Sequence, residues 1–69
     1  MAIPKDIKKG KLDLAGLDGN AFAVIAAVRK ALKRAGNSET TIDAVTAEMK
    51  ASDYTHLIAV AGQVTESED

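Results

Sequence analysis

The sequence contains no cysteine and no tryptophan, and only one proline, one histidine, one phenylalanine and one tyrosine. Without cysteine there can be no disulfide framework, no thiolate zinc site and no cysteine nucleophile. The longest uninterrupted apolar run, residues 21–28, is much shorter than the about 20 residues of a membrane-spanning helix, and it does not lie at the start as a secretory signal would. We therefore expect an unprocessed, cytoplasmic protein with no membrane association.

The apolar residues that are present are mostly small. Of the 69 residues 46% are hydrophobic, but 13 are alanines, so few large side chains are available for a core. A domain of this length buries only about 60% of the surface that its unfolded chain exposes. Folding as a single domain is therefore marginal, and we expect a homodimer; a monomer whose N-terminal segment folds back on its own chain is the alternative.

Charges are grouped along the chain although they nearly cancel overall. The net charge of −1 provides no general attraction to nucleic acid. Residues 29–34 carry four positive charges, whereas residues 39–53 sum to −3 and residues 66–69 add a further −3. These opposed blocks predict complementary packing, either within one chain or between two.

Residues 18–36 have the features of an amphipathic helix. Asp18 can cap its first turn, Gly36 can take the left-handed conformation after its last turn, and basic side chains lie at the end where the helix dipole favours cations. Alanines in the first half of this helix would let another backbone approach closely. Its predicted buried face consists of Val24, Ile25, Val28, Leu32 and Ala35.

A second helix is predicted over residues 38–51, with Ser38 or Thr40 as its N-cap. A third is predicted over residues 53–62, with Ser52 or Asp53 as its N-cap and Gly62 as an early stop. Apolar residues recur in both at spacings of three and four. The predicted buried residues are Ile42, Val45 and Met49 in the second helix and Tyr54, Leu57, Ile58, Ala61 and Val64 along the third.

Residues 1–17 lack a helical pattern and are predicted to be extended. Residues 12–14 alternate as in a β-strand, and Lys9-Gly10 is a candidate turn. A lone strand cannot satisfy its backbone hydrogen bonds, so this strand must pair with residues 3–8, with a C-terminal extension near Val64, or with another chain. The sequence leaves these three alternatives open. Residues 63–69 are predicted to be an acidic tail that frays from Thr65 onward.

No motif points to an enzyme, a metal or a cofactor. The run Asp18-Gly19-Asn20 does not fit a calcium loop, because the first and last ligand positions would fall on Leu14 and Ile25. His56 has only Asp53 near it in the sequence, which is too few ligands for zinc and is better explained by helix capping than by a catalytic relay. We expect His56 to be solvated or locally hydrogen-bonded, near Tyr54, and Tyr54 to lie at the rim of the core.

The basic end of the first helix provides the most specific functional hypothesis. Its four cations could follow a phosphate backbone, with the lysines of the N-terminal segment extending that surface. The helix that follows is acidic, and no aromatic residue is interleaved with the cations, which disfavours a helix-turn-helix protein and a single-strand binder. The candidate interaction residues are Arg29, Lys30, Lys33, Arg34, Tyr54 and His56.

Several short runs resemble a group of short uncharacterised proteins of bacteria and phages. The resemblance covers roughly residues 12–61 and rests on D-G-N-A-F at residues 18–22, R-A-G at residues 34–36 and D-Y-x-H-L at residues 53–57. The sequence differs from that group in two places. It has Ala51-Ser52 before Asp53 where the group often has a glycine before the aspartate, and its tail is less apolar. The resemblance implies a short stand-alone protein of phage or mobile-element origin, and it transfers no activity.

Together these patterns predict a mostly α protein, a small three-helix domain with a short extended segment at its N-terminus. Its predicted function is that of a non-enzymatic protein-interaction module, with an unidentified protein or a second copy as partner. The alternative is an accessory nucleic-acid-binding protein that uses the basic face of the first helix.

Overall fold

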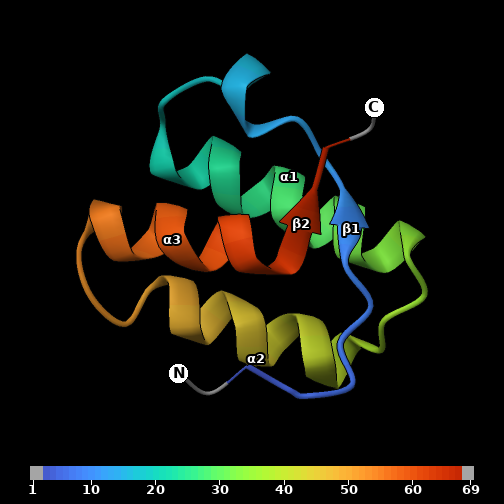
Figure 1. Ribbon diagram of the computed structural model, residues 1–69. Helices are drawn as coiled ribbons and strands as arrows, with labels where there is room; N and C mark the ends of the chain where they lie inside the picture. Colours follow the sequence, from blue (N-terminus) through green and yellow to red (C-terminus); the bar gives the residue numbers. More distant parts are fainter. Residues whose placement is uncertain (1–2, 68–69) are drawn as a thin grey trace.

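The computed structural model describes residues 3–67 and contains three helices and two very short strands (Figure 1). Each helix packs against the other two, and the strands lie side by side at one end of the helices. The predicted small three-helix domain with an extended N-terminal segment is confirmed. In chain order the elements are β1 (Gly10–Lys11), the 3-10 helix η1 (Leu14–Gly16), α1 (Ala21–Arg34), α2 (Glu39–Met49), α3 (Tyr54–Val64) and β2 (Thr65–Glu66).

Side-chain caps set the start of each α-helix. Ser38 caps α2 by accepting a hydrogen bond from the Thr41 N–H, and Asp53 caps α3 through the His56 N–H. The predicted cap at Asp18 is wrong, because Asn20 accepts the hydrogen bond of the first turn at 2.8 Å. Asp18 instead accepts a bond from the Asn20 N–H, which moves the start of α1 to Ala21.

Two glycines predicted as helix stops behave differently. Gly36 has a φ of +98° and follows the end of α1, as predicted. Gly62 does not stop α3, which continues to Val64. A methyl group at Gly62 would meet no atom within 4 Å, so this position faces open space, whereas Val64 on the opposite side is fully buried. Packing of Val64 outweighs the cost of about 1 kcal/mol of one glycine in a helix.

The core is a single cluster to which all three α-helices contribute. The predicted buried residues of α1 and α2 are in it, except that Ala35 is only partly buried. On α3 the predicted residues Leu57, Ala61 and Val64 are buried. Ile58 is only partly buried and Tyr54 is exposed, whereas Val60, which was not predicted, is fully buried. The largest fully buried side chains are Leu32, Ile42, Met49, Val24, Val28, Val45, Val60 and Val64.

The N-terminal strand pairs with the segment that follows α3. Strands β1 and β2 are parallel, with Gly10 opposite Thr65, and the Leu12 N–H donates to the Glu66 carbonyl at 2.9 Å. The C-terminal extension was one of the three predicted partners, and it is the one observed. Pairing prevents fraying at Thr65, whose hydroxyl also donates to the Ala61 carbonyl at 2.7 Å. The end of the predicted fraying tail, residues 68–69, lies outside the described residues.

The position of the strand was predicted wrongly. Residues 12–14 do not form it, because the Asp13 carboxylate accepts the Ala15 N–H and starts the 3-10 helix η1 there. Gly10 is no turn but part of β1, and it is buried against α1. A methyl group at Gly10 would lie 2.7 Å from the Ala31 Cβ. The close backbone approach to α1 therefore occurs within the chain, near the C-terminal end of the helix.

Candidate functional site

The two aromatic side chains of the protein lie on one groove at the start of α1 and α3. Phe22 is the second residue of α1 and Tyr54 is the first residue of α3, and both line a groove of about 420 Å³. We call it the aromatic groove. Its remaining lining residues are Ala21, Ile25, Met49, Lys50, Ser52, Asp53 and Leu57.

Local hydrogen bonds place the two aromatic residues. Phe22 follows the Asn20 cap, and its own N–H is the donor to that cap. Tyr54 directly follows the Asp53 cap, whose carboxylate accepts the His56 N–H at 2.9 Å. Phe22 is nevertheless 79% exposed and Tyr54 45% exposed. The capped first turns thus hold two aromatic side chains at the surface.

The aromatic groove has an apolar floor and a polar margin. Ile25, Met49 and Leu57 belong to the hydrophobic core, yet they also line the groove. Lys50 and Asp53 are exposed and carry one charge of each sign. The groove can accept an apolar side chain while its margin contacts polar groups.

His56 joins α3 to α2 by a side-chain hydrogen bond. Its Nε2 lies 2.8 Å from Glu48 Oε2 and 3.1 Å from the Glu48 carbonyl oxygen. His56 is hydrogen-bonded, but the predicted solvated or local environment is wrong, because its ring is partly buried and bonds to Glu48 of another helix, α2. Residues 3–67 contain no group of three histidine, aspartate or glutamate side chains that could hold a metal ion.

The basic residues of α1 are divided between two hollows, because Arg29, Lys30 and Lys33 line one beside α2 and Arg34 lines another. Arg29 donates hydrogen bonds to Asp43 at 3.1 Å and to Thr46 at 2.7 Å, and it lies 3.5 Å from Glu39. Lys33 lies 3.9 Å from Glu39. The opposed charge blocks therefore pack within the chain, between α1 and α2. Lys30 and Arg34 form no ion pair with a carboxylate of the described residues.

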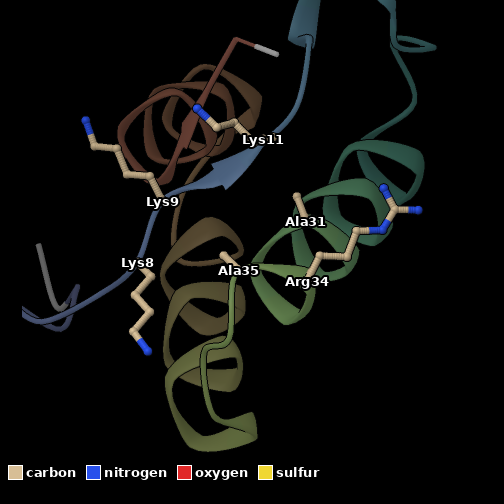
Figure 2. A pocket seen from close by; sticks show the side chains of 6 residues that line it. All are labelled: Lys8, Lys9, Lys11, Ala31, Arg34 and Ala35. Carbon is tan, nitrogen blue, oxygen red and sulfur yellow. The ribbon is translucent and has the colours of Figure 1, made fainter.

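Arg34 belongs to a second hollow, which we call the basic cleft. Its rim consists of Lys8, Lys9 and Lys11 from the N-terminal segment and Arg34 from α1, and Ala31 and Ala35 form its floor (Figure 2). The cleft has a volume of about 360 Å³. Lys11 Nζ lies 2.6 Å from Glu66 Oε1, and this hydrogen bond lowers the pKa of Glu66.

The six predicted interaction residues lie in four places. Arg29, Lys30 and Lys33 line one hollow of about 180 Å³ with Glu39 and Ile42 of α2. Arg34 lines the basic cleft, Tyr54 lines the aromatic groove, and His56 contacts Glu48.

Sequence reasoning missed Phe22, although a signal was present. Phe22 precedes Arg29 by seven residues, which places both on the same side of a helix, away from the apolar face. A phenylalanine on the charged side of a helix is an exposed phenylalanine. No local signal in the sequence predicts that Lys8 and Lys9 lie in one cleft with Arg34, because this depends on where β1 packs.

No helix formed by residues 3–67 is long and apolar enough to span a membrane. No protein-family model, curated protein or solved structure matches this chain.

Proposed function

We propose that this protein is a small, non-enzymatic protein-interaction module that acts through the aromatic groove. The observation that carries the proposal is that both aromatic residues of the chain are exposed on the same groove. Burying a phenylalanine side chain is worth about 1.5–3 kcal/mol. The fold does not bury Phe22, although the domain has few large apolar residues. The free energy of burying this side chain therefore remains available to a partner that covers it.

The lining of the groove indicates the kind of partner. Aromatic residues at the centre of an interface, with an apolar pocket beside them and polar groups around it, are typical of protein contacts. The partner would insert an apolar side chain between Phe22 and Tyr54. Its flanking polar groups would contact Lys50 and Asp53.

The resemblance to short bacterial and phage proteins supports the same surface. Two of the runs on which it rests, residues 18–22 and 53–57, contain the caps and the aromatic residues of the groove. A short protein of phage or mobile-element origin that acts by binding another protein fits this arrangement.

A second copy of the chain is one partner with the required chemistry. Phe22 is both a wall of the groove and an exposed apolar side chain, so a two-fold contact would bring each Phe22 to the groove of the other copy. An unpaired strand over residues 12–14 would have offered a second contact to another copy, but these residues form no strand and the Leu12 N–H already donates to the Glu66 carbonyl.

Sedimentation equilibrium at about 0.1 mM protein tests the homodimer, since a contact with a dissociation constant of about 1 μM makes the protein largely dimeric at that concentration. We expect dimer for the unchanged protein and monomer for the double variant Phe22→Ser/Tyr54→Ser. The matched control is Ala47→Ser/Ala59→Ser, which changes two exposed positions outside the groove.

If the unchanged protein is a monomer, the homodimer is excluded, and proteins captured from host extract are purified and titrated with the same variants. Loss of binding in the aromatic double variant, with binding retained by the control, would support the proposal. Equal binding by both variants would overturn it.

A further inference from the structure

We propose that the basic cleft binds the phosphate backbone of a double-stranded nucleic acid, without reading its base sequence. The cleft shares no lining residue with the aromatic groove. This inference therefore goes beyond the proposed protein contact and does not depend on it.

The charge of the cleft is the first support. Among residues 3–67, its lining contains four cations and no carboxylate. Lys8, Lys9 and Arg34 form no ion pair with a carboxylate among residues 3–67, whereas Lys11 is paired with Glu66. Three cations of the lining are therefore without an ion-pair partner among the described residues, in a protein whose net charge is −1. The face of α1 beside α2 is different, because Arg29 and Lys33 there form ion pairs with acidic residues.

The second support is that the backbone that carries Lys8 and Lys9 is held in place at two points, Lys8 and Gly10. The Asn37 side chain accepts the Lys8 N–H at 2.9 Å and donates to the Lys8 carbonyl at 2.7 Å. Gly10 packs directly on Ala31, which fixes the next part of the segment against α1. Lys8, Lys9 and Arg34 are therefore brought together by ordered backbone, although they are distant in the sequence.

The direction of the side chains indicates an extended anion. Figure 2 shows the charged ends of Lys8, Lys9 and Arg34 pointing away from one another around the floor of Ala31 and Ala35. Such ends do not converge on a single phosphate, but they can each contact a different phosphate along a chain. A nucleic acid presents phosphates in this way.

The absence of aromatic residues from the lining favours a duplex over a single strand. Proteins that bind single strands stack the bases on aromatic side chains, and both aromatic residues of this chain line the other groove. The floor offers only alanine methyl groups and no hydrogen-bond donors for base edges. Contacts to phosphate alone position a protein on a duplex without specifying its sequence.

Fluorescence anisotropy of a labelled DNA duplex of about 20 base pairs, measured at several salt concentrations, tests the inference. Three phosphate contacts predict that the logarithm of the binding constant falls with the logarithm of the salt concentration with a slope of about −2.7. Between about 50 and 200 mM salt, the binding constant should therefore fall roughly 40-fold. Duplexes of different sequence should bind equally.

Two triple variants of equal net charge separate the cleft from a general charge effect. Lys8→Ser/Lys9→Ser/Arg34→Ser removes the cations of the cleft that have no ion-pair partner, and Lys5→Ser/Lys30→Ser/Lys33→Ser removes three exposed cations outside it. We expect the first to abolish binding at about 50 mM salt and the second to retain most of it. Circular dichroism checks that both variants are folded. Equal loss in both variants, or no binding by the unchanged protein, would overturn the inference.

The variant Glu66→Gln should bind the DNA duplex more strongly than the unchanged protein. The change leaves Lys11 without its carboxylate partner and so adds a fourth phosphate contact, which makes the slope steeper by about 0.9. Vesicles containing phosphatidylserine test the other source of phosphate. Binding to vesicles, without binding to the duplex, would contradict a nucleic-acid partner.

Discussion

At the residue scale, the pair of Lys11 and Glu66 has a measurable electrostatic signature. The hydrogen bond and the charge of Lys11 lower the pKa of Glu66 from its ordinary value of 4.5. Desolvation opposes this lowering, and Lys9 adds the smallest effect, which is again to lower the pKa. Because the folded-state pKa lies below the unfolded one, this group favours folding above its ordinary pKa. That contribution is lost as the pH falls through the lowered value.

We expect Lys11→Ser to raise the pKa of Glu66 toward 4.5, because the change removes the hydrogen bond and the nearest positive charge. Carboxyl carbon shifts followed by NMR between acidic and neutral pH measure the pKa in both proteins. Lys30→Ser, which removes a cation from α1 outside the basic cleft, is the control and should leave it unchanged. The same pKa for Glu66 in the unchanged protein and in Lys11→Ser would contradict the assignment.

At the scale of elements, the packing of β1 on α1 determines the form of the basic cleft. Gly10 is buried, and an added methyl group would lie 2.7, 2.8 and 2.9 Å from the Cβ, carbonyl carbon and carbonyl oxygen of Ala31. Two of these three atoms belong to the helix backbone and cannot turn away. Only glycine lets the strand approach the helix this closely.

Gly10→Ala should destabilise the protein by about 1–3 kcal/mol, the usual range for overpacking. Urea unfolding followed by circular dichroism measures the change. Gly19→Ala is the matched control, since a methyl group there would meet no atom within 4 Å. Adding Ala31→Gly to Gly10→Ala should not restore stability, because the backbone atoms of residue 31 remain. Full restoration would show that the side chain alone sets the contact.

At the scale of the whole molecule, stability depends on one small core. The principal extents of 29 × 27 × 15 Å describe a flat molecule, and one cluster of buried side chains joins all three helices. Leu32 is fully buried in this cluster and is one of its largest side chains. A cavity at Leu32 would therefore affect every helix at once.

We expect Leu32→Ala to lower the free energy of unfolding by about 2–5 kcal/mol, which is a large part of the about 5–15 kcal/mol of a typical domain. Thermal and urea denaturation measure this loss. Leu17→Ala, at a partly buried position beside the core, should cost less. Similar losses at both positions would mean that α1 is not central to the fold.

Much of the fold could be predicted because the signals are local. Capping by Ser38 and Asp53, the glycine after α1 and the buried faces of α1 and α2 all depend on residues within a few positions of one another. The wrong prediction of Asp18 as the cap of α1 is also a local matter, since Asp18 and Asn20 are both good capping residues and lie two residues apart.

The candidate sites depended on contacts between distant residues. Pairing of Gly10 with Thr65 joins the two ends of the chain, and no periodicity within either segment contains that information. The same pairing places three lysines beside Arg34, while the packing of α2 on α1 compensates Arg29 and Lys33. The sequence alone determined the approximate positions of the three helices and the buried sides of α1 and α2, because those signals lie within a few residues of one another. Tertiary packing decided which charges and aromatic residues remain available at the surface, because side chains compete for partners across the whole molecule.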